Sequence, residues 1–134
     1  MKARKIFILM LFFFIFFILY SYNKNIFKDI GPHGGRVKSA GSYNIEMKVA
    51  SHNFQAFLLD NQLNPISNKG MTCEIRFFLC DSSTIDIDLK PFGDDAFMVE
   101  SSLKGYYYYN VVFHVFGKQI KAKFEDENLI VLNK

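Results

Sequence analysis

The stretch Ile85-Asp86-Ile87-Asp88-Leu89-Lys90 decides the fold class of this chain. Apolar and charged residues alternate in it with a period of two, which is the pattern of a β-strand that buries one face. The same alternation occurs in residues 43–49 and 120–124. We therefore expect three strands whose apolar side chains, those of Ile85 and Ile87 among them, face a core while the intervening polar side chains face solvent.

Four further segments are rich in aromatic and β-branched residues and predict additional strands: residues 54–59, 71–79, 96–99 and 107–116. Asn, Asp, Gly and Pro, the residues that favour turns, separate them. About seven short strands with regular turns predict an all-β fold, an immunoglobulin-like β-sandwich, with a small barrel as the alternative. We assign the sandwich to residues 43–134, with residues 129–132 as a candidate edge strand.

An unbroken apolar run occupies residues 6–20, and Lys2, Arg4 and Lys5 precede it. A positive segment followed by an apolar one is how secretory signals begin, but no small-residue cleavage site follows here. We therefore expect residues 1–22 to form a signal anchor that crosses the inner or plasma membrane once as a transmembrane helix; a cleaved signal is the alternative. The positive charges place the N-terminus inside and residues 23–134 outside, in the periplasm.

The charge of the chain is concentrated in the same N-terminal tip. Lys2, Arg4 and Lys5 account for the whole formal net charge of +3, so the rest of the chain is formally neutral. A neutral domain without a basic patch excludes nucleic acid as an expected partner. Between the anchor and the first predicted strand, residues 23–42 contain several Gly and a Pro and are expected to form a linker and an entry turn.

No pattern in the chain predicts catalysis. The sequence lacks a Gly-x-Ser-x-Gly elbow and a glycine-rich phosphate loop, so we expect a protein that is not an enzyme. If one strand contains both Cys73 and Cys80, their odd separation makes the two side chains face opposite ways. We expect two free, packed thiols, and a disulfide only if the strand breaks between them.

The tyrosine run, one methionine and two histidines also have predicted environments. In the run of four tyrosines at residues 106–109, alternation places Tyr107 and Tyr109 in the core and Tyr106 and Tyr108 on the outer face, where they either pack across strands or meet a partner. Met47 is expected in the core, and His52 and His114 are expected in a solvated turn and on a solvated strand face.

The element Gly31-Pro32-His33-Gly34-Gly35, directly before a predicted β domain, resembles small exported domains associated with heavy-metal efflux adaptors of the Cus type. The resemblance extends over roughly residues 31–124 and includes Glu46 in the first strand and Lys121-Ala122-Lys123-Phe124 in the last. It implies an accessory role in metal homeostasis, with copper or zinc as the metal and efflux or envelope proteins as partners.

His33 has two interpretations. In the first, the tight turn holds it as one ligand of a copper or zinc site, with Glu46 or a Met as the second ligand. In the second, the element is only an entry turn in which the glycines adopt backbone angles that other residues resist. The rival hypothesis for the whole chain is a metal-independent domain for protein–protein interaction in the cell envelope.

Overall fold

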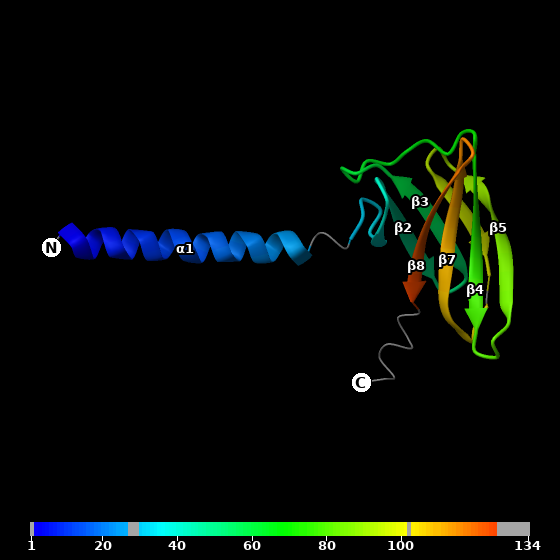
Figure 1. The fold of residues 1–134 in the computed structure, drawn as a ribbon, viewed down its shortest axis with the longest axis horizontal. Helices are drawn as coiled ribbons and strands as arrows, with labels where there is room; N and C mark the ends of the chain where they lie inside the picture. Colours follow the sequence, from blue (N-terminus) through cyan, green and yellow to red (C-terminus); the bar gives the residue numbers. More distant parts are fainter. Residues whose placement is uncertain (1, 27–29, 102, 126–134) are drawn as a thin grey trace.

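A computed structural model describes residues 2–26, 30–101 and 103–125, and these form one helix and eight strands (Figure 1). The elements in chain order are α1 (Lys2–Ile26), β1 (Arg36–Ala40), β2 (Tyr43–Ala50), β3 (Asn53–Leu59), β4 (Met71–Leu79), β5 (Thr84–Phe92), β6 (Ala96–Glu100), β7 (Tyr106–Val115) and β8 (Lys118–Glu125). The expectation of a mostly β chain with one N-terminal helix is confirmed. The candidate edge strand at residues 129–132 lies outside the described residues.

The strand count exceeds the expected seven because β1 lies within the segment that we predicted as a linker. The Arg36–Ala40 strand pairs with β2 through a tight turn at Gly41, where φ is +65°. Its polar residues carry no strong alternation, so the pattern alone did not distinguish it from a linker. The domain therefore begins earlier in the chain than residue 43.

All strands are antiparallel and form one sheet in the order β1-β2-β3-β6-β5-β4-β7-β8. The two ends of this order, β1 and β8, lie beside each other, so the sheet is nearly closed. β5 changes neighbours along its length: residues 84–89 pair with β4, whereas residues 90–92 pair with β6. Figure 1 shows β5 curving along one margin of the domain.

The main core lies between the facing halves of this sheet. Each strand from β2 to β8 contributes to it, and Ile45, Ile75, Phe77 and Phe113 are fully buried there. Met47 is buried and the apolar face of β8 is buried, as expected. Cys73 is a buried free thiol and Cys80 an exposed one, so the expectation of free thiols is confirmed but that of packing holds only for Cys73.

Strand β2 differs from the prediction of one buried face. Glu46, expected on a solvated face, has no exposed surface, while Val49, expected in the core, is 49% exposed. A second apolar cluster lies on the outer face beside Glu46 and is made of Val37 on β1, Phe57 and Leu59 on β3, and Ala96 on β6. The centre of β2 is thus covered on both faces. The end of β2, which includes the exposed Val49, extends beyond Met47, the last residue that pairs with β1.

The phase of the four tyrosines also differs from the prediction. Tyr106 and Tyr109 are buried, and Tyr107 is 52% exposed. The register between β4 and β7 shifts here, because Phe78 pairs with Tyr108 but Leu79 pairs with Tyr106. This irregularity leaves Tyr107 unpaired and reverses the alternation before it, as a β-bulge does.

The inner face of β5 is less buried than its sequence predicted. Leu89 is buried, but Ile87 is only half-buried and Ile85 is 37% exposed. The residues opposite them on β4, Ile75 and Phe77, are fully buried. The difference arises because residues 84–89 of β5 have a paired strand on one side only.

Candidate functional site

The segment of residues 31–35, here called the His33 loop, folds over the outer face of β2 and β3. Its backbone closes on itself, since the Gly31 amide donates to the Gly35 carbonyl at 2.8 Å and the Gly34 amide to the Gly31 carbonyl at 3.0 Å. Gly31 and Gly35 leave no space for a side chain: a Cβ at Gly31 would lie 2.3 Å from the Glu46 carboxyl carbon, and one at Gly35 would lie 2.5 Å from the Met47 carbonyl oxygen. The glycines thus permit a close approach of the loop to β2.

The Glu46 carboxylate is enclosed by this loop. Its Oε2 accepts the backbone amides of Gly35 at 2.8 Å and His33 at 3.0 Å, and its Oε1 lies 2.7 Å from Nδ1 of His33. The side chain has no exposed surface. A buried carboxylate is tolerated when donors of this kind surround it, and hydrogen bonds to a charged acceptor are the strong ones.

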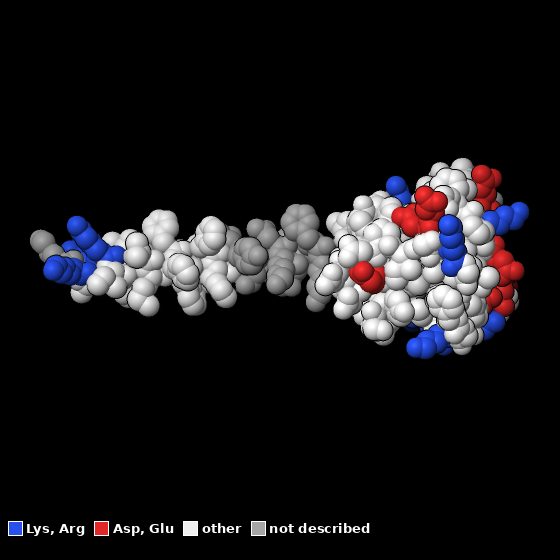
Figure 2. Space-filling view, turned by 90° about the horizontal axis from the view of Figure 1, so that it is seen from above, with Lys and Arg blue, Asp and Glu red and all other residues white. Residues whose placement is uncertain are grey.

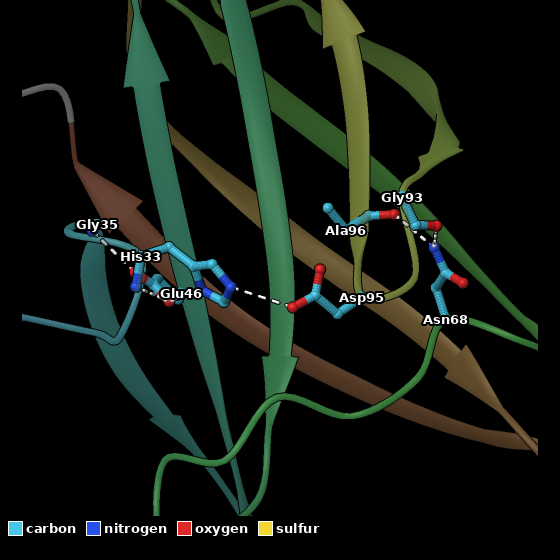
Figure 3. A network of polar contacts seen from close by, with 7 residues as sticks. All are labelled: His33, Gly35, Glu46, Asn68, Gly93, Asp95 and Ala96. Carbon is cyan, nitrogen blue, oxygen red and sulfur yellow. Dashed lines mark hydrogen bonds and ion pairs between the residues drawn. The ribbon is translucent and has the colours of Figure 1, made fainter.

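The His33 ring is held on three sides, and Figure 3 shows two of these contacts, those with Glu46 and Asp95. It stacks on Phe57 with the ring centroids 3.7 Å apart and the planes at 12°. Nδ1 faces Glu46, and Nε2 lies 3.1 Å from Oδ2 of Asp95. Opposite an ionised Glu46, which can only accept, Nδ1 is the donor; Nε2 donates to Asp95 when it also carries a proton and offers a lone pair when it does not.

Asp95 reaches His33 from the turn between β5 and β6. Figure 3 shows Asn68 holding this turn from the far side. The Asn68 side-chain amide donates to the carbonyls of Gly93 at 3.0 Å and Ala96 at 2.9 Å, and its backbone amide donates to the Asp94 carbonyl at 2.9 Å. The turn that carries Asp95 is therefore fixed independently of His33.

The structure brings together the two residues that we predicted as metal ligands, but it gives them different environments. Both oxygens of Glu46 are engaged by the His33 loop and are fully buried, whereas the His33 and Asp95 side chains are 25% and 35% exposed. An imidazole held by a second carboxylate is the usual arrangement of a metal-binding histidine. Nε2 of His33 and Oδ2 of Asp95 thus fit a zinc or copper(II) ion chemically, with Glu46 orienting the ring.

His33 and Asp95 supply only two ligands, which is few for a metal site. Within residues 2–26, 30–101 and 103–125, no group of three or more His, Cys, Asp and Glu side chains converges in a way that could hold a metal. A metal at His33 and Asp95 would need water or a partner for its remaining positions, as open sites do.

No protein-family model matches this chain, and no curated protein matches it.

The other predicted residues lie elsewhere. His52 is exposed in the turn between β2 and β3, and His114 is half-buried on the outer face of β7, 3.3 Å from Glu74. Both environments agree with the expectation. Asp95 and Phe57 were missed, because Asp94-Asp95 resembled an ordinary turn and Phe57 an ordinary core residue.

Proposed function

We propose that this chain is an exported, membrane-anchored β domain that acts as a binding or accessory module, not an enzyme, in copper or zinc homeostasis or efflux. Its N-terminus lies inside the inner or plasma membrane, its domain lies in the periplasm, and its partners are efflux or envelope proteins. The observation that carries the metal assignment is the half-buried His33–Asp95 pair, whose histidine ring is oriented by the buried Glu46.

The anchor is supported by the surface of α1. The apolar side chains from Ile6 to Ile18 are 48% to 76% exposed, and Lys2, Arg4 and Lys5 precede them. Figure 2 shows these cations at one tip of the helix and uncharged side chains behind them. A helix that is apolar on all sides buries its surface in lipid or protein. In the part of the chain that the structure describes, no helix combines the length and the hydropathy that a membrane span requires.

For the finer architecture we propose an immunoglobulin-like sandwich whose two layers share one strand. The support is the division of β5, which pairs with β4 in its first half and with β6 in its second. One layer then contains β1, β2, β3 and β6, and the other contains β4, β7 and β8.

The metal assignment is tested by titrating the full chain, in a non-ionic detergent, with Zn(II), Cu(II) and Cu(I). We expect Asp95→Asn and His33→Ala to weaken binding at least tenfold, and Glu46→Gln to weaken it by about 10- to 100-fold, as loss of an orienting carboxylate does. His114→Ala is the matched control, because His114 also lies beside a carboxylate, that of Glu74. Binding that survives His33→Ala unchanged, or that His114→Ala weakens equally, rejects the site.

A metal-independent interaction domain is the second candidate. Two observations favour it. Both ring nitrogens of His33 already face carboxylate oxygens, and within the described residues no group of three or more His, Cys, Asp and Glu side chains could hold a metal ion. The His33 loop would then serve only to pack on the apolar cluster of β1, β3 and β6, where His33 stacks on Phe57. The same titration separates the two candidates, since this one predicts no binding above the nonspecific level.

A further inference from the structure

Among the described residues, positions 84–89 of β5 form an open strand edge. Residues 84–89 pair with β4 on one side, but β6 pairs with β5 only from Lys90 to Phe92. β6 itself continues along β3 to Glu100, so the two strands part beyond Met98. Backbone N–H and C=O groups on the free side of such a strand are a template for another strand.

A groove lies where β5 and β6 part. It has a volume of about 320 Å³ and is lined by the apolar residues Pro91, Phe92, Met98 and Val99 together with charged residues from both strands, Asp88 and Lys90 on β5 and Glu100 on β6. Along the edge itself, Ile85 is 37% exposed and Ile87 is half-buried on the inner face of the strand. Apolar side chains here are positioned to pack against those of an added strand.

The outer face of the same edge is acidic. Asp86 is paired with Arg76, through Arg76 Nε at 2.6 Å and Nη2 at 2.9 Å. Asp88 instead lies directly opposite Glu74 on β4, and like charges in that relation are unfavourable. Within the described ranges, no Lys, Arg or His lies within ion-pair distance of Asp88. A cationic side chain on an added strand would relieve this repulsion.

We propose that residues 84–88 of β5 bind an extended segment of a partner protein in which basic and apolar residues alternate. The segment adds a strand to the free edge, places its apolar side chains against Ile85, Ile87 and the groove, and places its Lys or Arg beside Asp88. Backbone hydrogen bonds supply affinity, and the alternating side chains supply specificity. A second copy of this chain is a poor occupant, because its own edge would bring Asp86 and Asp88 against the same residues. This proposal does not depend on metal binding.

The probe is a blocked hexapeptide of alternating lysine and valine, added to the ¹⁵N-labelled full chain in a non-ionic detergent. We expect saturable amide shifts and slowed hydrogen exchange at residues 84–88. A glutamate–valine hexapeptide, and a lysine–valine hexapeptide methylated on alternate amides, are expected to bind at least tenfold more weakly. Asp88→Asn is expected to weaken binding about two- to fivefold, as loss of an exposed ion pair does.

Glu125→Gln is the matched control, since it removes an exposed carboxylate at the end of β8, on another edge of the sheet. The proposal is overturned if the methylated peptide binds equally, if the shifts centre on β1 or β8, or if Glu125→Gln weakens binding as much as Asp88→Asn. Concentration-dependent dimers that protect residues 84–88 without peptide would also overturn it, because a second copy would then occupy the edge.

Discussion

The carboxylate of Glu46 lies 2.7 Å from Nδ1 of His33 and is completely buried beneath the loop that carries this histidine. The two residues are 13 positions apart, and the intervening chain forms β1 and its turn into β2. The charge on Glu46 holds the loop through two backbone amides and one ring nitrogen. The loop in turn stacks His33 on Phe57 of the apolar cluster on β1, β3 and β6, so each part supports the other.

Gly35→Ala is predicted to destabilise the domain by about 1–3 kcal/mol, the usual cost of inserting a methyl group into a filled space. The new Cβ would lie 2.5 Å from the Met47 carbonyl oxygen, which is backbone and cannot move aside easily. Gly34→Asn is the control. Gly34 has φ +82°, a Cβ added there would meet nothing within 4 Å, and Asn tolerates this backbone region. Urea unfolding should therefore show a larger loss of stability for Gly35→Ala than for Gly34→Asn, although Ala is the smaller residue. The opposite order would contradict the packing described for the loop.

Glu46→Gln is predicted to lower the free energy of unfolding by about 2–3 kcal/mol, because an amide carbonyl accepts the backbone amides of His33 and Gly35 more weakly than a carboxylate does and the Gln amide nitrogen, in place of Oε1, faces Nδ1 of His33. The amide of Gly35 should then exchange with solvent faster, since its acceptor is weakened. Thermal unfolding and hydrogen exchange measure the two effects. Glu100→Gln, on an exposed residue, should change stability by no more than about 0.5 kcal/mol. Equal effects of the two substitutions would show that Glu46 does not hold the loop.

The buried thiol of Cys73 makes stability depend on alkaline pH. Burial, and to a lesser degree the charge of Glu74, raises the pKa of Cys73 well above its ordinary value. The folded state therefore keeps a proton that the unfolded chain releases above about pH 8.5. Since the folded state binds more protons, the contribution of the protonated Cys73 to the free energy of unfolding is complete below that pH. It declines as pH rises, by up to about 1.4 kcal/mol per pH unit.

Urea unfolding at pH 7 and pH 10 measures this decline, and Cys73→Ala should reduce it. Cys80→Ser, which alters an exposed thiol, should leave it unchanged. A Cys73→Ala chain that loses as much stability between the two pH values as the unsubstituted chain would refute the assignment.

Phe116→Asn is predicted to stabilise the domain by about 1 kcal/mol, because Asn accepts the left-handed backbone region at lower cost than Phe. Phe116 and Gly117 form the two-residue turn between β7 and β8, with φ +48° and +78°, and Phe116 is 90% exposed. Little packing is lost with the ring. Phe116→Ala keeps the strain and should give no comparable gain in melting temperature, so a gain of equal size would assign the effect to removal of the ring instead.

The sequence predicted the strands better than it predicted their surroundings. Alternation located β2, β5 and β8, and aromatic and β-branched residues located β3, β4, β6 and β7. Alternation failed to predict the burial of Tyr106, because the bulge there depends on how β7 pairs with β4, and the tyrosine segment by itself does not determine that register. It failed for Ile85, because alternation says which side chains share a face and not whether a neighbouring strand covers them.

The candidate site was predicted in part. Gly31-Pro32-His33-Gly34-Gly35 was recognised as a built turn, and Glu46 was named as its partner on the strength of a family resemblance. Asp95 and Phe57 could not be predicted, since each is distant from His33 in sequence and belongs to a common type of turn or strand.

The sequence by itself determined the β content, the apolar segment behind a basic tip, and the place of the glycine-rich turn, because period-two alternation, hydropathy and glycine conformation are local properties. Only the tertiary structure decided that Glu46 is buried, that Asp95 meets Nε2 of His33, and that residues 84–88 keep a free edge. These features depend on which strands lie side by side and where their pairing ends, and that is set by packing between segments far apart in the chain.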